Sequence, residues 1–181
     1  MKEKIKVYEK QSLAKQIRDA YEAAKTPLTF EPEHLVHIGE NIYGYTNLEK
    51  ASEYLHAKGI CLAAVVSAKT MFGETLQIVM CNNIAFELPE YVQEFLIQHE
   101  IGHAVNGDLN MTPLESCKLM IKRTLGFLPE MELKADAYAA KVNGIESTKN
   151  AIKFLILDTN LPFISKLELI RRYKKVHYCL E

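Results

Sequence analysis

The apolar pattern of this chain changes at Pro89. Before this residue, two runs rich in Val, Ile and Leu, at residues 60–68 and 75–82, are typical of strands joined by a short connection. After it, apolar residues recur at every third or fourth position almost to the C-terminus, which is the period of an amphipathic helix. The sequence therefore predicts the α+β class, with a small antiparallel sheet at about residues 60–82 and a mostly helical C-terminal half.

Prolines and glycines mark the ends of the expected helices. Pro89 and Pro129 stand where a helix can begin, while Gly107 and Gly144 stand where one can end. The expected helices cover residues 11–25, 47–58, 89–107, 112–125, 129–143, 147–157 and 165–177. Residues 29–45 fit neither the helical nor the strand period clearly, so we assign no element to them.

Length and charge limit the classes of partner. The 181 residues suit one ordinary domain, and neither a repeat nor a linker divides them, so we expect a single domain over residues 1–181. A net charge of −1 lacks the positive field that binding to nucleic acid requires. No apolar run approaches the roughly 20 residues of a membrane span, and the charged residues 1–6 are unlike a secretory signal. We therefore expect a cytoplasmic protein whose oligomeric state is open.

The strongest chemical signal is the segment His99-Glu100-Ile101-Gly102-His103. Two histidines four residues apart on a helix project from one face, so both imidazoles can bind one metal ion. Glu100 follows the first histidine and points to the adjacent side, where a metal-bound water would lie. Zinc lowers the pKa of such a water toward about 7, and a neighbouring carboxylate can then accept its proton. This pattern predicts a zinc site with Glu100 as a general base.

A catalytic zinc ion usually has a third protein ligand, and Glu132 is the best candidate for it. It lies 132 − 103 = 29 residues after His103, at the start of another expected helix. One turn later, Asp136 could accept a hydrogen bond from a ligand histidine, and small residues such as Ala135 would let the two helices approach closely. Two alternatives stay open. Glu132 could have no metal role, because the helix dipole favours carboxylates in any first helical turn, and His177 could be the third ligand instead.

These two segments resemble the gluzincin-type zincin metallopeptidases. In that group H-E-x-x-H is completed by E-x-x-A-D on a later helix, and this chain has H-E-I-G-H and E-L-K-A-D-A-Y-A-A. The chain is similar to small cytosolic ImmA/IrrE-like or HtpX-like zinc peptidases over about residues 75–142. The resemblance implies a small sheet packed on a helical zincin-like domain. It also implies that His99, His103 and Glu132 are zinc ligands, that Glu100 is the general base, and that Asp136 supports a ligand.

The resemblance gives looser expectations for the substrate side. The segment 167–176 is similar to a late R-I-x-x-L helix of that group, which would place Arg172 near the site; a basic, solvated helix face is the alternative. Tyr138 and Arg172 are candidate oxyanion or substrate contacts. By analogy with zincins, residues 75–82 would form the edge strand to which a peptide substrate adds through backbone hydrogen bonds.

Two functions are compatible with these residues. The first is a zinc-dependent endopeptidase that hydrolyses a protein or peptide substrate, and one form of this hypothesis is a regulatory peptidase that cuts a repressor. The second is a zinc-stabilised protein-interaction module with little or no turnover, since small domains gain folding energy from a metal. The presence of Glu100 beside the two histidines favours the peptidase, because a purely structural site has no use for a base at that position.

Overall fold

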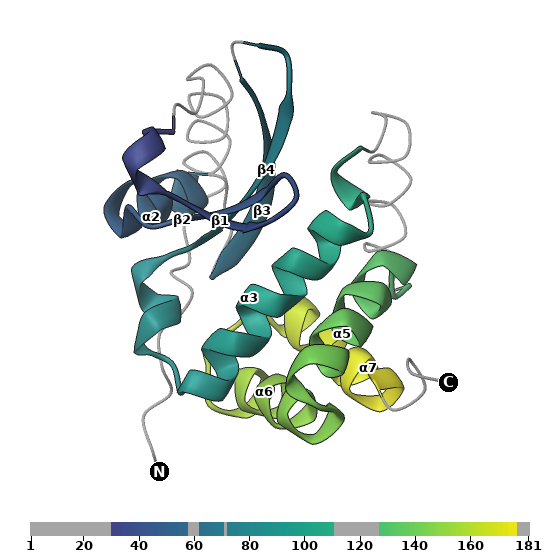
Figure 1. Ribbon diagram of the computed structural model, residues 1–181. Helices are drawn as coiled ribbons and strands as arrows, with labels where there is room; N and C mark the ends of the chain where they lie inside the picture. The colour runs from purple at the N-terminus through teal and green to yellow at the C-terminus, as the bar shows by residue number, and fades with distance from the viewer. Residues whose placement is uncertain (1–29, 58–61, 71, 111–126, 177–181) are drawn as a thin grey trace. The chain divides into compact units, whose positions relative to one another are not determined.

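The computed structural model describes residues 30–57, 62–70, 72–110 and 127–176, and these group into two compact units. The described residues up to Leu88 form a sheet unit, and those from Pro89 onward form a helical unit (Figure 1). The boundary coincides with the change of apolar pattern at Pro89. The α+β class is therefore confirmed, while the single domain over residues 1–181 stays a prediction.

The sheet unit contains four strands and one α-helix. The strands are β1 (Leu35–Gly39), β2 (Ile42–Tyr45), β3 (Ala63–Lys69) and β4 (Thr75–Cys81), in the order β1-β2-β4-β3. The expected antiparallel pair is confirmed as β3 and β4, with Val65 opposite Val79. The sheet is larger than predicted and mixed, because β2 pairs with β1 in the antiparallel direction and with β4 in the parallel direction.

The hairpin of β1 and β2 lies in residues 29–45, where the sequence predicted no element. Residues 36–38 of β1 are all exposed, so this strand lacks the alternation of buried and exposed positions that marks a half-buried strand. The register between the two strands also shifts between His37 and Gly39, and Glu40 in the connecting turn has a positive φ of 37°. Short, exposed and irregular strands leave little periodicity in a sequence.

The expectation that residues 75–82 form an edge strand is wrong. Strand β4 is internal, because Ile78 lies opposite Tyr43 of β2 on one side and Val66 of β3 on the other. A peptide cannot add beside residues 77–79, since both sides of the strand are already paired there. Asn82 does not continue the strand either: its side chain accepts a hydrogen bond from the Ala85 backbone N–H at 2.8 Å and caps the 3₁₀ helix η2 (Asn83–Glu87).

Helix α2 (Leu48–Ala57) covers the core of the sheet unit. It begins after Asn47, whose side chain accepts the Lys50 backbone N–H at 3.2 Å, as expected for an N-cap. The buried cluster of this unit comprises Tyr45, Ala51, Leu55, Ile78 and Met80. The sheet and helix α2 thus share one apolar core. A short 3₁₀ helix, η1 (Pro32–His34), comes before β1 in the sequence.

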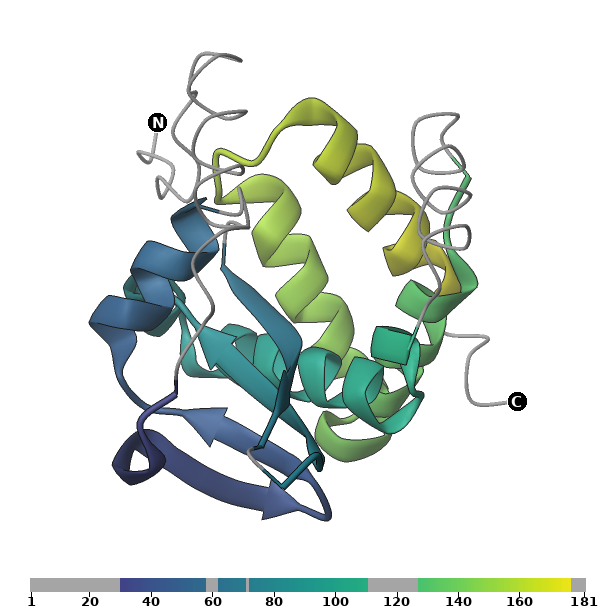
Figure 2. The same ribbon diagram turned by 90° about the horizontal axis from the view of Figure 1, so that it is seen from above.

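The helical unit consists of α3 (Glu90–Val105), α5 (Glu130–Asn143), α6 (Ile145–Leu157) and α7 (Phe163–Lys175), with the 3₁₀ helix η3 (Asp108–Asn110) after α3 (Figures 1 and 2). Helix α3 contacts both α5 and α6, and α6 contacts α7. The expected helices at residues 89–107, 129–143, 147–157 and 165–177 are confirmed within a few residues. Those expected at residues 11–25 and 112–125 lie outside the described residues.

Proline and glycine determine where these helices begin and end. Helices α3 and α5 follow Pro89 and Pro129, respectively. The chain turns after α3 at Gly107 and after α5 at Gly144, which have positive φ angles of 72° and 87° that glycine adopts without strain. None of the described helices combines the length and the apolar content that crossing a membrane requires.

Candidate metal centre

The two histidines of the H-E-I-G-H segment lie together on one face of α3. Both are buried, and their Nε2 atoms are 3.1 Å apart. The ring of Phe95, one turn earlier on α3, packs against His99 with the ring centroids 5.7 Å apart. Four-residue spacing on a helix thus directs both imidazoles toward one point, as the sequence predicted.

Glu132, in the first turn of α5, joins the pair. Its Oε2 lies 3.4 Å from the Nε2 of His99 and 3.9 Å from that of His103. The side chain of Glu132 is only 6% exposed, whereas that of Glu130 in the same turn is 79% exposed and pairs with Lys134. The helix dipole favours both carboxylates, but only a specific partner explains why Glu132 is buried.

These three donor atoms have a spacing that suits a metal ion. Ligands about 2.0–2.1 Å from a tetrahedral zinc ion lie about 3.3 Å from one another, and the observed separations are 3.1, 3.4 and 3.9 Å. Two imidazoles and one carboxylate are also a donor set that zinc accepts. The buried group of His99, His103 and Glu132 could therefore hold a metal ion.

The close approach of α3 and α5 depends on Gly102. A Cβ atom added there would lie 2.9 Å from the Cα of Ala135 and 3.0 Å from both the carbonyl oxygen of Ala135 and the Cβ of Tyr138. The sequence predicted that small residues on the second helix would allow this approach. The sequence analysis missed the need for a glycine on α3. A glycine inside a helix lowers helix stability, so its presence at position 102 was a signal of close packing.

Replacing Gly102 is therefore expected to disturb the site. In Gly102→Ala, the added methyl group forces α5 away from α3, and overpacking of this kind costs about 1–3 kcal/mol of unfolding free energy. We expect a lower midpoint in urea denaturation and weaker zinc binding, because Glu132 moves with α5. Gly39→Ala is the control, since a Cβ added at Gly39 meets no atom within 4 Å. Equal stability of both variants would contradict this role of Gly102.

Arg172 of α7 connects the two carboxylates of α5. Its Nε and Nη2 atoms donate to the two oxygens of Asp136 at 2.8 and 2.6 Å, and Nη1 donates to the Oε2 of Glu132 at 3.1 Å. Arg172 is buried, whereas Arg171 and Tyr173 are exposed. The alternative of a wholly solvated basic face thus does not hold for Arg172. This two-point geometry is the strong form of an arginine–carboxylate contact.

Burial by itself would make these charges unfavourable, but their mutual contacts outweigh it. Burial raises the pKa of Asp136, yet the Arg172 charge and the hydrogen bond to His99 lower it below its usual value. Burial also raises the pKa of Glu132, while the hydrogen bond to His99 and the Arg172 charge hold it well below the usual range. Both carboxylates are therefore ionised at neutral pH.

The charges around the centre suit a divalent cation. Asp108, which accepts at 2.8 Å from the Nδ1 of His103, brings a third carboxylate to the group that contains Glu132 and Asp136. One guanidinium, that of Arg172, offsets one of these three charges. The carboxylates of this group thus outnumber its guanidinium, and such an excess of negative charge favours a divalent cation.

Without a metal, His99 takes up part of this excess charge. Its Nδ1 lies 3.0 Å from Asp136 and 3.1 Å from the Nη2 of Arg172. Burial and the Arg172 charge lower the pKa of His99, but the hydrogen bonds to Asp136 and Glu132 outweigh them and raise it to about 9. Metal-free His99 is therefore protonated at neutral pH.

Metal binding should consequently release a proton. Because His99 binds a metal only through a neutral ring nitrogen, its proton competes with the ion at every pH below about 9. The apparent zinc affinity is expected to fall by about tenfold for each pH unit below that value through this group alone. Competition with a chromophoric chelator at a series of pH values measures the slope. An affinity that does not change with pH would contradict this protonation of His99.

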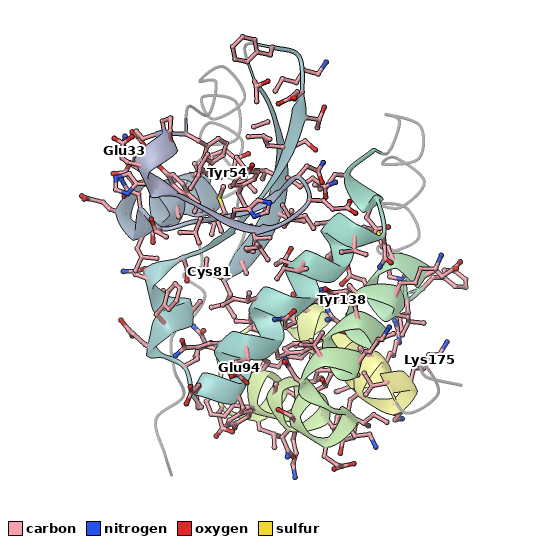
Figure 3. The ribbon with its side chains drawn as sticks, in the orientation of Figure 1. Glu33, Tyr54, Cys81, Glu94, Tyr138 and Lys175 are labelled. Atoms are coloured by element: carbon pink, nitrogen blue, oxygen red, sulfur yellow. The ribbon has the colours of Figure 1, made fainter. Side chains whose placement is uncertain are left out.

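The other predicted residues lie as follows. Glu100 is half-buried on α3, directly after His99. Tyr138 is half-buried on α5, close to Gly102 (Figure 3). His177, the alternative third ligand, lies outside the described residues. The sequence missed Asp108, although it follows the helix-ending Gly107 and is only five residues from His103.

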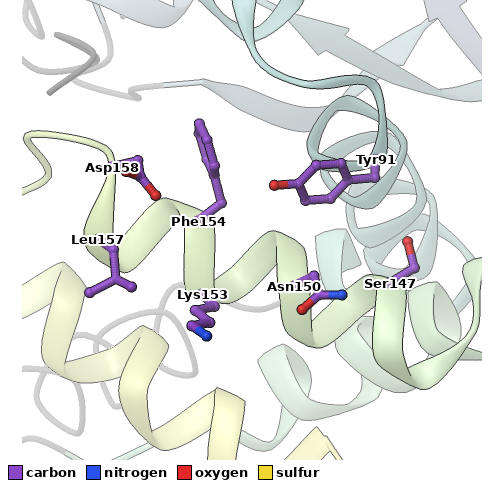
Figure 4. A pocket seen from close by; sticks show the side chains of 7 residues that line it. All are labelled: Tyr91, Ser147, Asn150, Lys153, Phe154, Leu157 and Asp158. Atoms are coloured by element: carbon purple, nitrogen blue, oxygen red, sulfur yellow. The ribbon is translucent and has the colours of Figure 1, made fainter. Parts of the chain in front are cut away.

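The helical unit also has an open cavity of about 590 Å³ that contains none of the cluster residues (Figure 4). Its lining side chains come from α3, α6 and the residue after α6: Tyr91, Ser147, Asn150, Lys153, Phe154, Leu157 and Asp158. The rings of Tyr91 and Phe154 meet edge to face, with their centroids 6.3 Å apart. We assign this cavity no role in the chemistry of the metal centre.

Comparisons of the chain with models of known protein families, with curated proteins and with solved structures gave no match. Function is therefore inferred from the residues of the centre and from the H-E-I-G-H and E-L-K-A-D segments.

Proposed function

We propose that this chain is a zinc-dependent endopeptidase, similar to the gluzincin-type zincins, that hydrolyses peptide bonds of a protein substrate. The observation that carries the proposal is the buried group of His99, His103 and Glu132, with Glu100 next to its first histidine. Zinc suits two imidazoles and one carboxylate better than the harder magnesium or calcium ions do. The peptide substrate and a cytoplasmic location belong to the same proposal.

Each residue of the centre has a distinct role in this mechanism. His99, His103 and Glu132 would hold the ion, which when bound polarises the substrate carbonyl and lowers the pKa of the attacking water. The Glu100 carboxylate accepts a proton from that water and donates it to the nitrogen of the leaving amine. With only three protein ligands, a bound zinc ion would keep a position for water or substrate, which is typical of catalytic rather than structural zinc.

Asp136 and Arg172 support this arrangement from outside the ligand set. Asp136 accepts from the Nδ1 of His99 and thereby directs the Nε2 lone pair toward the ion. The donors of Arg172 are directed at Asp136 and Glu132, so we propose that it positions these carboxylates rather than contacting substrate. Tyr138 remains the candidate for a contact with the oxyanion or substrate.

Metal content and hydrolysis together test the proposal. The purified full chain is expected to contain about one zinc ion and to cleave members of a mixed library of unstructured peptides. Removal of zinc with 1,10-phenanthroline should abolish cleavage, and added zinc should restore it. One tightly bound zinc ion without cleavage of any library member would favour the interaction module instead.

A pair of variants tests the third ligand. Glu132→Ala should lose the zinc ion, because two histidines alone bind it weakly, and His177→Ala should retain it. The opposite result would assign the third position to His177.

A further inference from the structure

Each histidine of the centre has its own carboxylate partner, and the two partners come from different parts of the helical unit. Asp136 of α5 lies 3.0 Å from the Nδ1 of His99. Asp108 lies 2.8 Å from the Nδ1 of His103 and belongs to η3, which follows α3. The two carboxylates thus contact equivalent ring nitrogens, although they are 28 residues apart in the sequence (136 − 108 = 28).

The end of α3 folds back so that Asp108 can reach His103. The backbone N–H of Asn106 donates to Gly102 at 3.0 Å, and that of Gly107 donates to Ala104 at 3.1 Å, which closes the last turn of the helix. Gly107 then adopts a φ of 72°, and the chain reverses into η3. This turn brings the carboxylate of Asp108 back beside a histidine in the last turn of α3.

This contact determines which nitrogen of His103 faces the metal position. A carboxylate accepts a proton but cannot donate one, so the Nδ1 of His103 carries the hydrogen in the contact with Asp108. The lone pair of the neutral ring is then at Nε2, the atom that lies 3.1 Å from the Nε2 of His99 and 3.9 Å from Glu132. A carboxylate on the far nitrogen also makes the ring a stronger ligand.

The surroundings of the two carboxylates differ. Asp136 is fully buried and also binds the Arg172 guanidinium through both of its oxygens, so its loss would disturb the fold as well as the metal centre. The side chain of Asp108 is 16% exposed and makes its ion pair with His103. A change at Asp108 therefore alters the surroundings of His103 and should disturb the fold less than a change at Asp136.

We propose that Asp108 is a positioning residue that fixes the ring orientation and tautomer of His103 for metal binding. The proposal rests on the metal centre of the proposed function. The Nδ1–H group of His103 stays with the Asp108 carboxylate, and the Nε2 lone pair stays free for the ion. Loss of such a partner typically weakens metal affinity by about 10–100-fold.

Three variants test this role: Asp108→Ala, Asp108→Asn and the control Asp158→Asn, which changes an exposed aspartate of the same unit. Zinc affinity is measured by competition with a chromophoric chelator. We expect a loss of about 10–100-fold in Asp108→Ala, an intermediate loss in Asp108→Asn and no loss in the control. The asparagine variant is intermediate because its carbonyl still accepts the Nδ1–H of His103 but carries no charge.

A second measurement separates this proposal from the proposed function. In the metal-free chain, ring ¹⁵N chemical shifts report the tautomer of His103, and Asp108→Ala is expected to change them while the circular dichroism stays that of the folded wild-type chain. A chain that binds no zinc but shows this change would refute both the peptidase and a role of Asp108 in zinc binding, and would retain only the control of the His103 tautomer by Asp108. Wild-type zinc affinity or unchanged His103 shifts in Asp108→Ala would refute the positioning role.

Discussion

The Glu100→Gln variant is expected to retain one zinc ion at wild-type affinity and to lose peptide hydrolysis by about 10²–10⁴-fold, the usual effect of removing a general base. Glutamine has nearly the same shape as glutamate but cannot accept the proton of the attacking water. Because Glu100 is not one of the three expected ligands, the metal should stay. Zinc content and initial rates with the same peptide, measured on the same preparation, give both results.

Glu94→Gln is the matched control for this experiment. Glu94 lies on the same helix and is exposed (Figure 3), so the variant removes the same charge away from the metal centre. Its rate should equal that of the wild-type chain. Retained hydrolysis in Glu100→Gln would refute the assignment of Glu100 as the base, whereas loss of zinc from that variant would give it a different, structural role.

The Arg172→Met variant is expected to lose about 3–5 kcal/mol of unfolding free energy when no metal is bound. The reason is that Asp136 and Glu132 are buried, ionised and hydrogen-bonded to this guanidinium. Removing one partner of a buried ion pair leaves the other charges without compensation. Urea denaturation in the presence of a chelator measures the loss.

Arg171→Met is the control, because Arg171 precedes Arg172 on α7 and is exposed. Addition of zinc should restore part of the stability of Arg172→Met, since a divalent cation beside Glu132 offsets some of the missing charge. If Arg172→Met proved as stable as Arg171→Met, the guanidinium of Arg172 would not be what stabilises the buried charges of Asp136 and Glu132.

Much of the fold could be predicted from the sequence because its signals are local. Pro89 and Pro129 precede helices, Gly144 ends one, and the Val-rich and Ile-rich runs form the hairpin of β3 and β4. The hairpin of β1 and β2 could not be predicted, because its exposed residues have no apolar alternation. The pairing of β2 with β4 links residues far apart in the chain, and it makes β4 internal rather than an edge.

The candidate centre could be predicted only in part, for a similar reason. His99 and His103 are placed by helical spacing alone, and the burial of Glu132 follows from the contact of α3 with α5. Helical spacing does not distinguish Arg172 from the exposed Arg171. Only the similarity of residues 167–176 to a late zincin helix singles out Arg172, and the packing of α7 is what buries it. Asp108 reaches His103 through a turn at Gly107 whose path the sequence does not specify.

The most direct test of the metal centre is the anomalous scattering of crystals of the zinc-loaded chain, recorded on both sides of the zinc absorption edge. We expect one anomalous peak with the Nε2 atoms of His99 and His103 and a carboxylate oxygen of Glu132 each at about 2.0–2.2 Å. A zinc peak bound to other side chains, with these three atoms not coordinating it, would contradict the proposed centre and the peptidase mechanism that depends on it.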